Sequence, residues 1–223
     1  WLVSRPTDAP GAHAAVPDWY AAYAYTRWRP TVYSVASRET SFFSGPPDAD
    51  GVPLPSTRRR RQIEVGLALP ISHVRVVDVA RVSLIRASDA VAFADRTVAL
   101  DRSAARVAWS MSSAHVYGRS ISPEGGVTAG ATAEFTRRAI GASGDATTYT
   151  GDVRAYLPGA RTGHVFAVRV SGGSSVGEKN LRQTFLLGGS FTQPVAAFSG
   201  DGFSLLRGFA PNTFAGTTVA LVN

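Results

Sequence analysis

The sequence QIEVGLAL at residues 62–69 decides the fold class of this chain. Ile63, Val65, Leu67 and Leu69 carry large apolar side chains, whereas the residues between them are polar or small. A period of two places successive side chains on opposite faces of an extended strand. The stretch therefore predicts a β-strand that lies between an apolar and a polar environment.

The same alternation recurs along nearly the whole chain. We predict nine strands, at residues 18–28, 31–44, 60–70, 73–87, 102–117, 126–138, 147–157, 163–172 and 216–223. Most of them are longer than the ~5 or 6 residues of a typical strand in a globular protein. Their lengths fit the ~9 to 11 residues that a tilted strand needs to cross an outer membrane.

The predicted connections alternate between short and long. The short ones are residues 29–30, 70–72 and 158–162, with an intermediate one at 118–125, and the long ones are 45–59, 88–101, 139–146 and 173–215. Outer-membrane barrels have short turns on the periplasmic side and longer loops outside. The pattern predicts an antiparallel transmembrane β-barrel over residues 18–223, preceded by a linker or loop at 1–17, where proline and glycine are frequent.

The composition excludes several other classes of protein. The 223 residues are 44% hydrophobic, include no cysteine and carry a formal net charge of +7. This apolar content excludes a disordered chain, and no window has the ~18 to 20 apolar residues of a transmembrane helix. The basic charge would suit nucleic acid, but no stacking aromatic residues are interleaved with the arginines. We therefore expect no nucleic-acid partner.

No motif points to catalysis or to a metal. The glycine-rich residues 172–179 have the spacing of a phosphate loop, but Glu178 stands where lysine is required. Asp48 and Asp50 suggest a calcium loop that lacks its closing carboxylate. The four histidines are far apart, and no Gly-x-Ser-x-Gly motif occurs. We predict a protein that is not an enzyme, with no catalytic residues, no metal ligands and no cofactor.

The strongest basic run is Arg58, Arg59, Arg60 and Arg61. In the predicted barrel it falls at the outer rim of a strand, next to a long loop. Guanidinium groups bind phosphates well, so outer-membrane lipid and lipopolysaccharide headgroups are the expected partners. A solvated loop end is the alternative, and both remain open at this point.

Three short segments near the C-terminal end carry a family resemblance. They are FLLGG at 185–189, LLRGF at 205–209 and FAG at 214–216, before the last predicted strand. In this order they resemble the long extracellular loop of the BamA/TamA family of outer-membrane β-barrels, also called bacterial surface antigens. Three more segments resemble other parts of family members: YAYTRWRP at 23–30, SISPEG at 120–125 and RAYLP at 154–158. The resemblance covers about residues 18–223.

The resemblance implies a location, an activity and a set of site residues. Family members insert or export proteins at the bacterial outer membrane, so a client outer-membrane or secreted protein is the expected partner. The loop at 173–215 is expected to fold inward, with Arg207 binding carboxylates on the inner wall through its planar fork of donors. A plain exposed turn is the alternative. The loop-tip motif is Leu206, Arg207, Gly208 and Phe209, and the loop glycines are Gly188, Gly189 and Gly216. The charges expected to face a wet lumen are Glu64, Glu134, Asp152 and Arg169.

The resemblance covers only part of the family's barrel. Family members have sixteen strands, and the matching segments begin around the fourth strand and stop within the twelfth. The chain is therefore expected to be the middle of a barrel, without the periplasmic N-terminal domain of the family. Two other functions remain open: a passive or secretion pore of the same fold, and a soluble, basic, all-β module that binds glycan or nucleic acid.

Overall fold

The computed structural model describes residues 2–4, 18–47, 53–93, 96–117, 123–161, 164–188, 202–203, 209 and 214–223. These residues are all-β, and the one helical segment among them is the short 3-10 turn η1, Arg138–Ile140. In this part of the chain no helix has the length and apolar character to cross a membrane. The fold class is thus confirmed at the level of an all-β protein whose main sheet is antiparallel.

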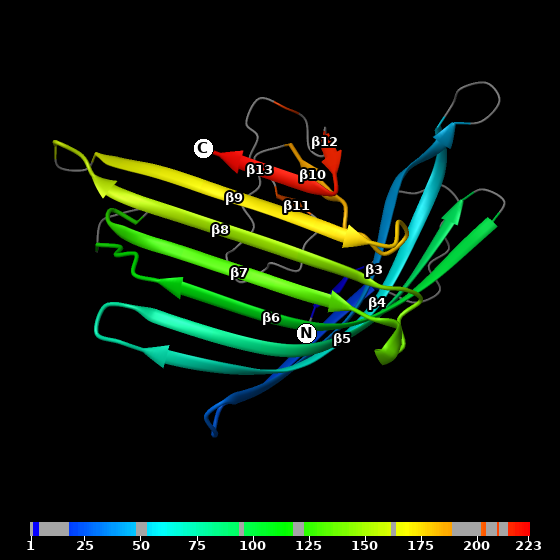
Figure 1. The fold of residues 1–223 in the computed structure, drawn as a ribbon, viewed down its shortest axis with the longest axis horizontal. Helices are drawn as coiled ribbons and strands as arrows, with labels where there is room; N and C mark the ends of the chain where they lie inside the picture. Colours follow the sequence, from blue (N-terminus) through cyan, green and yellow to red (C-terminus); the bar gives the residue numbers. More distant parts are fainter. Residues whose placement is uncertain are drawn as a thin grey trace. The chain divides into compact units, whose positions relative to one another are not determined.

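Ten strands form one sheet in the order β1-β2-β3-β4-β5-β6-β7-β8-β9-β13 (Figure 1). Their bounds are Leu2–Ser4 (β1), Asp18–Tyr25 (β2), Thr31–Pro47 (β3), Pro53–Ser72 (β4), Val77–Phe93 (β5), Arg96–Ser112 (β6), Gly126–Thr136 (β7), Ala146–Pro158 (β8), Val165–Gly177 (β9) and Thr218–Val222 (β13). A second sheet contains β10 (Phe185–Leu187) between β11 (Gly202–Phe203) and β12 (Phe214–Gly216). Among the described residues β1 and β13 do not pair with each other, so closure into a barrel stays a prediction.

All nine predicted strands are present, and several are longer than predicted. The predicted loop at 45–59 is largely strand, because β3 extends to Pro47 and β4 starts at Pro53. The predicted loop at 88–101 is shortened in the same way by β5 and β6. Proline and charged residues hide the apolar alternation in these segments. Strand pairing depends on backbone hydrogen bonds, however, and it continues without an apolar row.

Other predicted boundaries also differ from the structure. The predicted turn at 70–72 lies in β4, which ends at Ser72, and β6 ends at Ser112 and not at residue 117. The segment at 1–17, predicted as a linker or loop, contains β1, which pairs antiparallel with β2; its other residues lie outside the described ones. The predicted loop at 173–215 starts later, because β9 continues to Gly177. Glycine and serine at 172–175 have low strand propensity, but pairing with β8 on one side and β13 on the other completes this strand.

The chain divides into two compact units, which we describe separately. Unit 1 comprises Trp1–Leu67, Ser83–Ala105 and Thr136–Gly144. Unit 2 comprises Ala68–Val82, Arg106–Phe135 and Asp145–Asn223.

In unit 1, the residues after β7 cover the edge of β6. The Arg137 N–H donates to the Ser103 carbonyl at 3.3 Å, and the Ser143 N–H donates to the Asp101 carbonyl at 2.9 Å. The Asp101 N–H in turn donates to the Ser143 hydroxyl at 3.1 Å. Between these contacts, η1 is followed by its C-cap residue Gly141, whose φ of 93° is a left-handed conformation that favours glycine. The segment 137–143 thus satisfies backbone groups of β6 beyond the end of β7.

In unit 2, β9 lies between β8 and β13, and Figure 1 shows the three strands side by side. The pairing of β8 with β9 is antiparallel and runs along the full length of both strands. It places Asp152 opposite Ser171 and Arg154 opposite Arg169. This register determines which side chains meet in the site described next.

Candidate functional site

The large apolar side chains of β4 are exposed, and its carboxylate is shielded. Ile63, Val65 and Leu67 are 58%, 51% and 47% exposed, whereas Glu64 is 9% exposed. This is the reverse of a soluble protein, in which carboxylates are mostly exposed and large apolar side chains mostly buried. We call the exposed series of alternate apolar residues in a strand its apolar row, and the shielded series its polar row.

The strands of unit 2 have the same two rows. The apolar rows contain Val107 and Trp109 (β6), Val153 and Leu157 (β8), and Phe166, Val168 and Val170 (β9). The polar rows contain Arg106 (β6), Glu134 (β7), Asp152 and Arg154 (β8), and Arg169, Ser171 and Ser175 (β9). The four charges predicted to face a lumen therefore all lie on polar rows, while the lumen itself stays a prediction.

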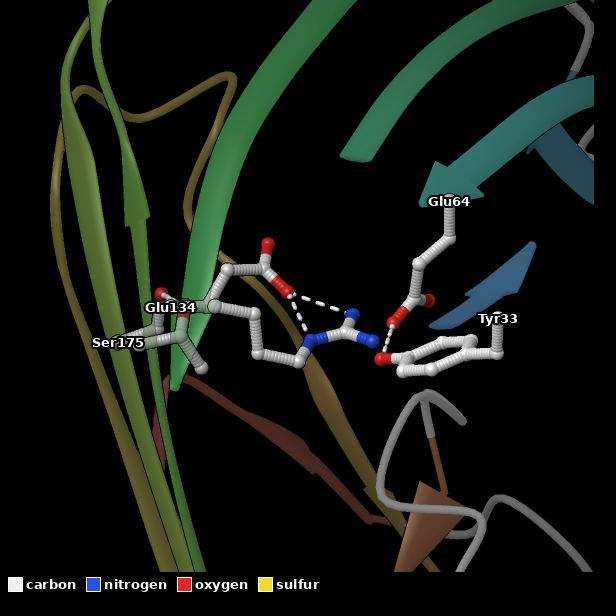
Figure 2. A network of polar contacts seen from close by, with 6 residues as sticks. Tyr33, Glu64, Glu134 and Ser175 are labelled. Atoms are coloured by element: carbon white, nitrogen blue, oxygen red, sulfur yellow. Dashed lines mark hydrogen bonds and ion pairs between the residues drawn. The ribbon is translucent and has the colours of Figure 1, made fainter. Parts of the chain in front are cut away.

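Glu64 is held by a tyrosine from the neighbouring strand, as Figure 2 shows. The Tyr33 hydroxyl of β3 donates to Glu64 Oε1 at 2.9 Å. The Tyr33 ring lies over Gly66, where a Cβ atom would come within 2.7 Å of the ring and of Ser83 Cβ in β5. Only a residue without a side chain leaves room for the ring here. Side chains from β3 and β5 thus converge on Gly66, and the tyrosine fixes the carboxylate on the polar row of β4.

The arginine run is divided between the two rows of β4. Arg58 and Arg60 bind Asp89 of β5, at 3.2 and 3.4 Å, and the Asp89 side chain is 11% exposed. Arg59 and Arg61 alternate with them and are exposed. The run therefore lies in a strand and not in a loop. A contact with lipid headgroups stays a prediction for Arg59 and Arg61, because Arg58 and Arg60 are engaged with Asp89.

Glu134, labelled in Figure 2, forms a second charged contact on the polar rows, with Arg106. Arg106 Nη2 and Nε donate to Glu134 Oε2 at 2.7 and 3.1 Å. The two side chains are only 14% and 7% exposed. Charge-assisted hydrogen bonds stabilise such a shielded pair, and removing one partner would leave the other charge uncompensated. The pair therefore holds β6 and β7 together on this side.

Asp152 binds two arginines. Its Oδ1 accepts from Arg154 Nε at 2.8 Å, and its Oδ2 accepts from Arg169 Nε and pairs with Arg169 Nη2. The two arginines lie directly opposite each other on β8 and β9, where like charges repel. Asp152, with its side chain 3% exposed, compensates one of these charges. One positive charge of the cluster remains in excess.

The sequence prediction contains only part of these charged contacts. It lacks Tyr33, Asp89, Arg106 and Arg154, which all hold or bind a charge on the polar rows. Arg154 has a local signal, because it follows Asp152 by two residues and so shares its face. The other partners come from neighbouring strands. Finding them requires the cross-strand register, which a single sequence does not supply.

The segment after β9 folds back onto the polar row of β9. The Gln183 N–H donates to Ser175 Oγ at 2.8 Å, and Ser175 Oγ also bonds to Thr148 Oγ1 at 2.9 Å. Phe185 is 1% exposed. Its ring lies over Gly173, where a Cβ atom would come within 2.7 Å of the ring. The beginning of the predicted inward loop thus packs on the same side of the sheet as the charged clusters of unit 2.

The predicted loop residues are described in part. Gly188 is buried and has a φ of 132°, which favours glycine. Gly216 lies in β12 and pairs with Phe185 of β10. Phe209 is 48% exposed, and its ring lies edge-on to Phe214 with 5.2 Å between centroids. Outside the described residues lie Gly189, Leu206, Arg207 and Gly208, so the position of the loop tip stays a prediction.

The chain matches no known family model and no curated protein. Its function has therefore to be argued from the site. Among the described residues, no three histidine, aspartate or glutamate side chains are grouped as metal ligands would be. What the site offers chemically is an array of arginines, carboxylates and hydroxyls that can bind and orient charged or hydrogen-bonding groups.

Proposed function

We propose that this chain forms part of a transmembrane β-barrel in the bacterial outer membrane, of the class that inserts or exports proteins. The observation that carries the proposal is the exposure of large apolar side chains on β4, β6, β8 and β9, while the charges between them are shielded. Removing apolar surface from water is worth ~25 cal/mol per Å², and lipid provides that environment. A wall between lipid and a wet lumen needs one apolar and one polar row in each strand.

The length of the apolar row of β4 supports a membrane span. The row runs from Ile63 to Ile71 and contains no charged residue. This length is close to the ~9 to 11 residues that a tilted transmembrane strand needs. Arg59 and Arg61 continue the row at one end, where the headgroup region would begin. Their guanidinium groups suit the phosphates of outer-membrane lipid or lipopolysaccharide.

Protein insertion or export is supported by the family resemblance and by the segment after β9. The resemblance implies a long loop that folds inward. Gln183 and Phe185, which follow β9, contact residues of its polar row. The client would be an outer-membrane or secreted protein. A passive or secretion pore of the same fold is the second candidate, because a segment on the polar rows could equally control conduction.

Charge substitutions on the two rows of β4 test the proposal. We expect Val65→Arg to lower strongly the yield of folded protein in lipid vesicles, because an arginine at mid-bilayer depth on the lipid face costs ~2 to 4 kcal/mol. Gln62→Arg, on the polar row of the same strand, is the matched control and should fold like the unchanged protein. Equal yields for the two variants would contradict the assignment of the rows.

Two further measurements separate the alternatives. Extraction from membranes only by detergent supports the barrel, whereas a monodisperse monomer in detergent-free buffer supports a soluble all-β binding module. In vesicles that contain the protein, faster insertion of a client outer-membrane protein indicates assembly activity. Ion conductance without an effect on the client indicates a pore.

A further inference from the structure

The charged cluster of β8 and β9 has hydrogen-bonding capacity that the described part of the chain does not use. Arg154 and Arg169 share the single carboxylate of Asp152, which has both oxygens engaged. Arg169 Nη1 and Ser171 Oγ are buried and have no hydrogen-bond partner among the described residues. A buried polar group without a partner is unfavourable, so an added acceptor at this point would stabilise the cluster.

The unused groups lie on one face of two adjacent strands. Ser171 is opposite Asp152, and Arg169 is opposite Arg154. Residues directly opposite each other, and residues two apart in one strand, point to the same side of a sheet. Ser171 is 4% exposed, whereas the side chains of Arg154 and Arg169 keep 19% and 14% of their surface exposed. Part of each arginine is therefore open to the polar side, whereas Arg169 Nη1 and Ser171 Oγ are buried and become reachable when an arginine side chain moves.

We propose that Arg154, Arg169 and Ser171 bind a small free oxyanion such as phosphate. The excess positive charge favours an anion over water, and a planar guanidinium suits phosphate oxygens. The Ser171 hydroxyl supplies a further donor. Asp152 orients both arginines and also repels an anion, so its charge weakens the binding. The inference rests on the proposed function in one respect: the polar rows must be reachable from water.

Calorimetric titration of the detergent-solubilised protein with inorganic phosphate, at constant ionic strength, tests this site. Arg154→Gln should weaken phosphate binding about tenfold or more, because hydrogen bonds to a charged group are lost. Ser171→Ala should weaken it about threefold. The matched control is Ser83→Ala, which removes the hydroxyl of another buried serine, on the polar row of β5; its phosphate affinity should be unchanged.

Asp152→Asn gives the most specific test, because it should strengthen phosphate binding, whereas Arg154→Gln and Ser171→Ala should weaken it. With the competing carboxylate charge removed, phosphate should bind about tenfold more tightly. A purely structural cluster would show no such gain. If Asp152→Asn does not fold, the phosphate affinities of Ser171→Ala and Ser83→Ala decide whether the site binds phosphate.

The proposal is overturned if the unchanged protein binds no phosphate, or if the two serine variants bind it equally well. Binding in detergent does not depend on insertion into vesicles. A failed titration therefore leaves the proposed membrane function standing, and a failed insertion test leaves the anion site standing.

Discussion

Two aromatic rings lie over glycines on polar rows, Tyr33 over Gly66 in unit 1 and Phe185 over Gly173 in unit 2. In both pairs a Cβ atom on the glycine would come within 2.7 Å of the ring. The two rings belong to different parts of the fold. Tyr33 belongs to β3, which pairs with β4 in the main sheet, whereas Phe185 belongs to β10 in the small second sheet.

This difference separates global from local stability. The backbone ladder keeps a ring on a neighbouring strand close to its glycine, so its packing contributes to the stability of the whole sheet. A ring on a separate segment contributes to a local equilibrium between a docked and an undocked segment. The same packing of ring on glycine therefore serves strand assembly in unit 1 and segment docking in unit 2.

The largest effect is expected for Phe185→Ala. Removing a buried phenylalanine side chain costs ~3 to 5 kcal/mol, and here the loss should fall on the docked state of the segment between β9 and β13. We expect much faster protease cleavage within residues 178–217, measured by the masses of the fragments, while the sheet keeps its circular dichroism. Phe166→Ala removes the same side chain from an exposed position of β9, where Phe166 is 72% exposed, and is the control. Cleavage of Phe185→Ala at the rate of the unchanged protein would show that the ring does not hold the segment.

A smaller effect, on global unfolding, is expected for Gly66→Ala. The new Cβ atom would lie 2.7 Å from both the Tyr33 ring and Ser83 Cβ, and overpacking of this kind costs ~1 to 3 kcal/mol. The free energy of unfolding in urea, measured in detergent or vesicles, should fall by that amount. Gly151→Ala is the control, because the nearest atom to its Cβ, Gly130 O, lies at 3.8 Å.

Double variants sharpen the same comparison. Adding Tyr33→Ala to Gly66→Ala should relieve only part of the strain, because Ser83 Cβ stays in place on β5. Adding Gly173→Ala to Phe185→Ala should cause little further loss, because the three atoms nearest to that Cβ position all belong to the Phe185 ring. Each pair of variants forms a double-mutant cycle. Equal coupling energies for Tyr33 with Gly66 and for Phe185 with Gly173 would contradict the different roles of the two rings.

The smallest effect is expected for Tyr33→Phe, which keeps the ring over Gly66 and removes one hydrogen bond. The free energy of unfolding should fall by about 1.5 kcal/mol, the lower end of the range for a hydrogen bond to a charged group. Ser175→Ala is its counterpart in unit 2, because it removes the acceptor of the Gln183 N–H. That variant should raise protease cleavage of the segment more than it lowers the unfolding midpoint. The assignment of global and local roles would be contradicted if Tyr33→Phe mainly raised protease cleavage of the segment and Ser175→Ala mainly lowered the unfolding midpoint.

The alternation of residues was sufficient to predict the strands and their two rows. Ile63, Val65 and Leu67 are exposed and Glu64 is shielded, as the period of two requires. The strand ends were less predictable, because β4 continues through the arginine run, where no apolar row marks it. There the contact of Arg60 with Asp89 holds the pair of strands together, and such a contact depends on register.

The candidate site was predictable only where one strand supplies it. Asp152 and Arg154 share a face by spacing alone, whereas the opposition of Arg154 and Arg169 follows from the β8–β9 register. The docking of Phe185 on Gly173 brings a later segment back onto β9. A resemblance can suggest such a return, but local periodicity carries no information about it.

The segment 137–143 also covers backbone groups of β6 with which a strand of another copy could otherwise pair. A strand that extends past its neighbour exposes unpaired N–H and C=O groups, and another strand can pair with them. In this chain β6 extends past the end of β7, and Arg137 and Ser143 occupy the carbonyls of Ser103 and Asp101. This cover removes one site of edge-to-edge aggregation. Chains with many long-range strand pairings fold slowly and are most exposed to that hazard.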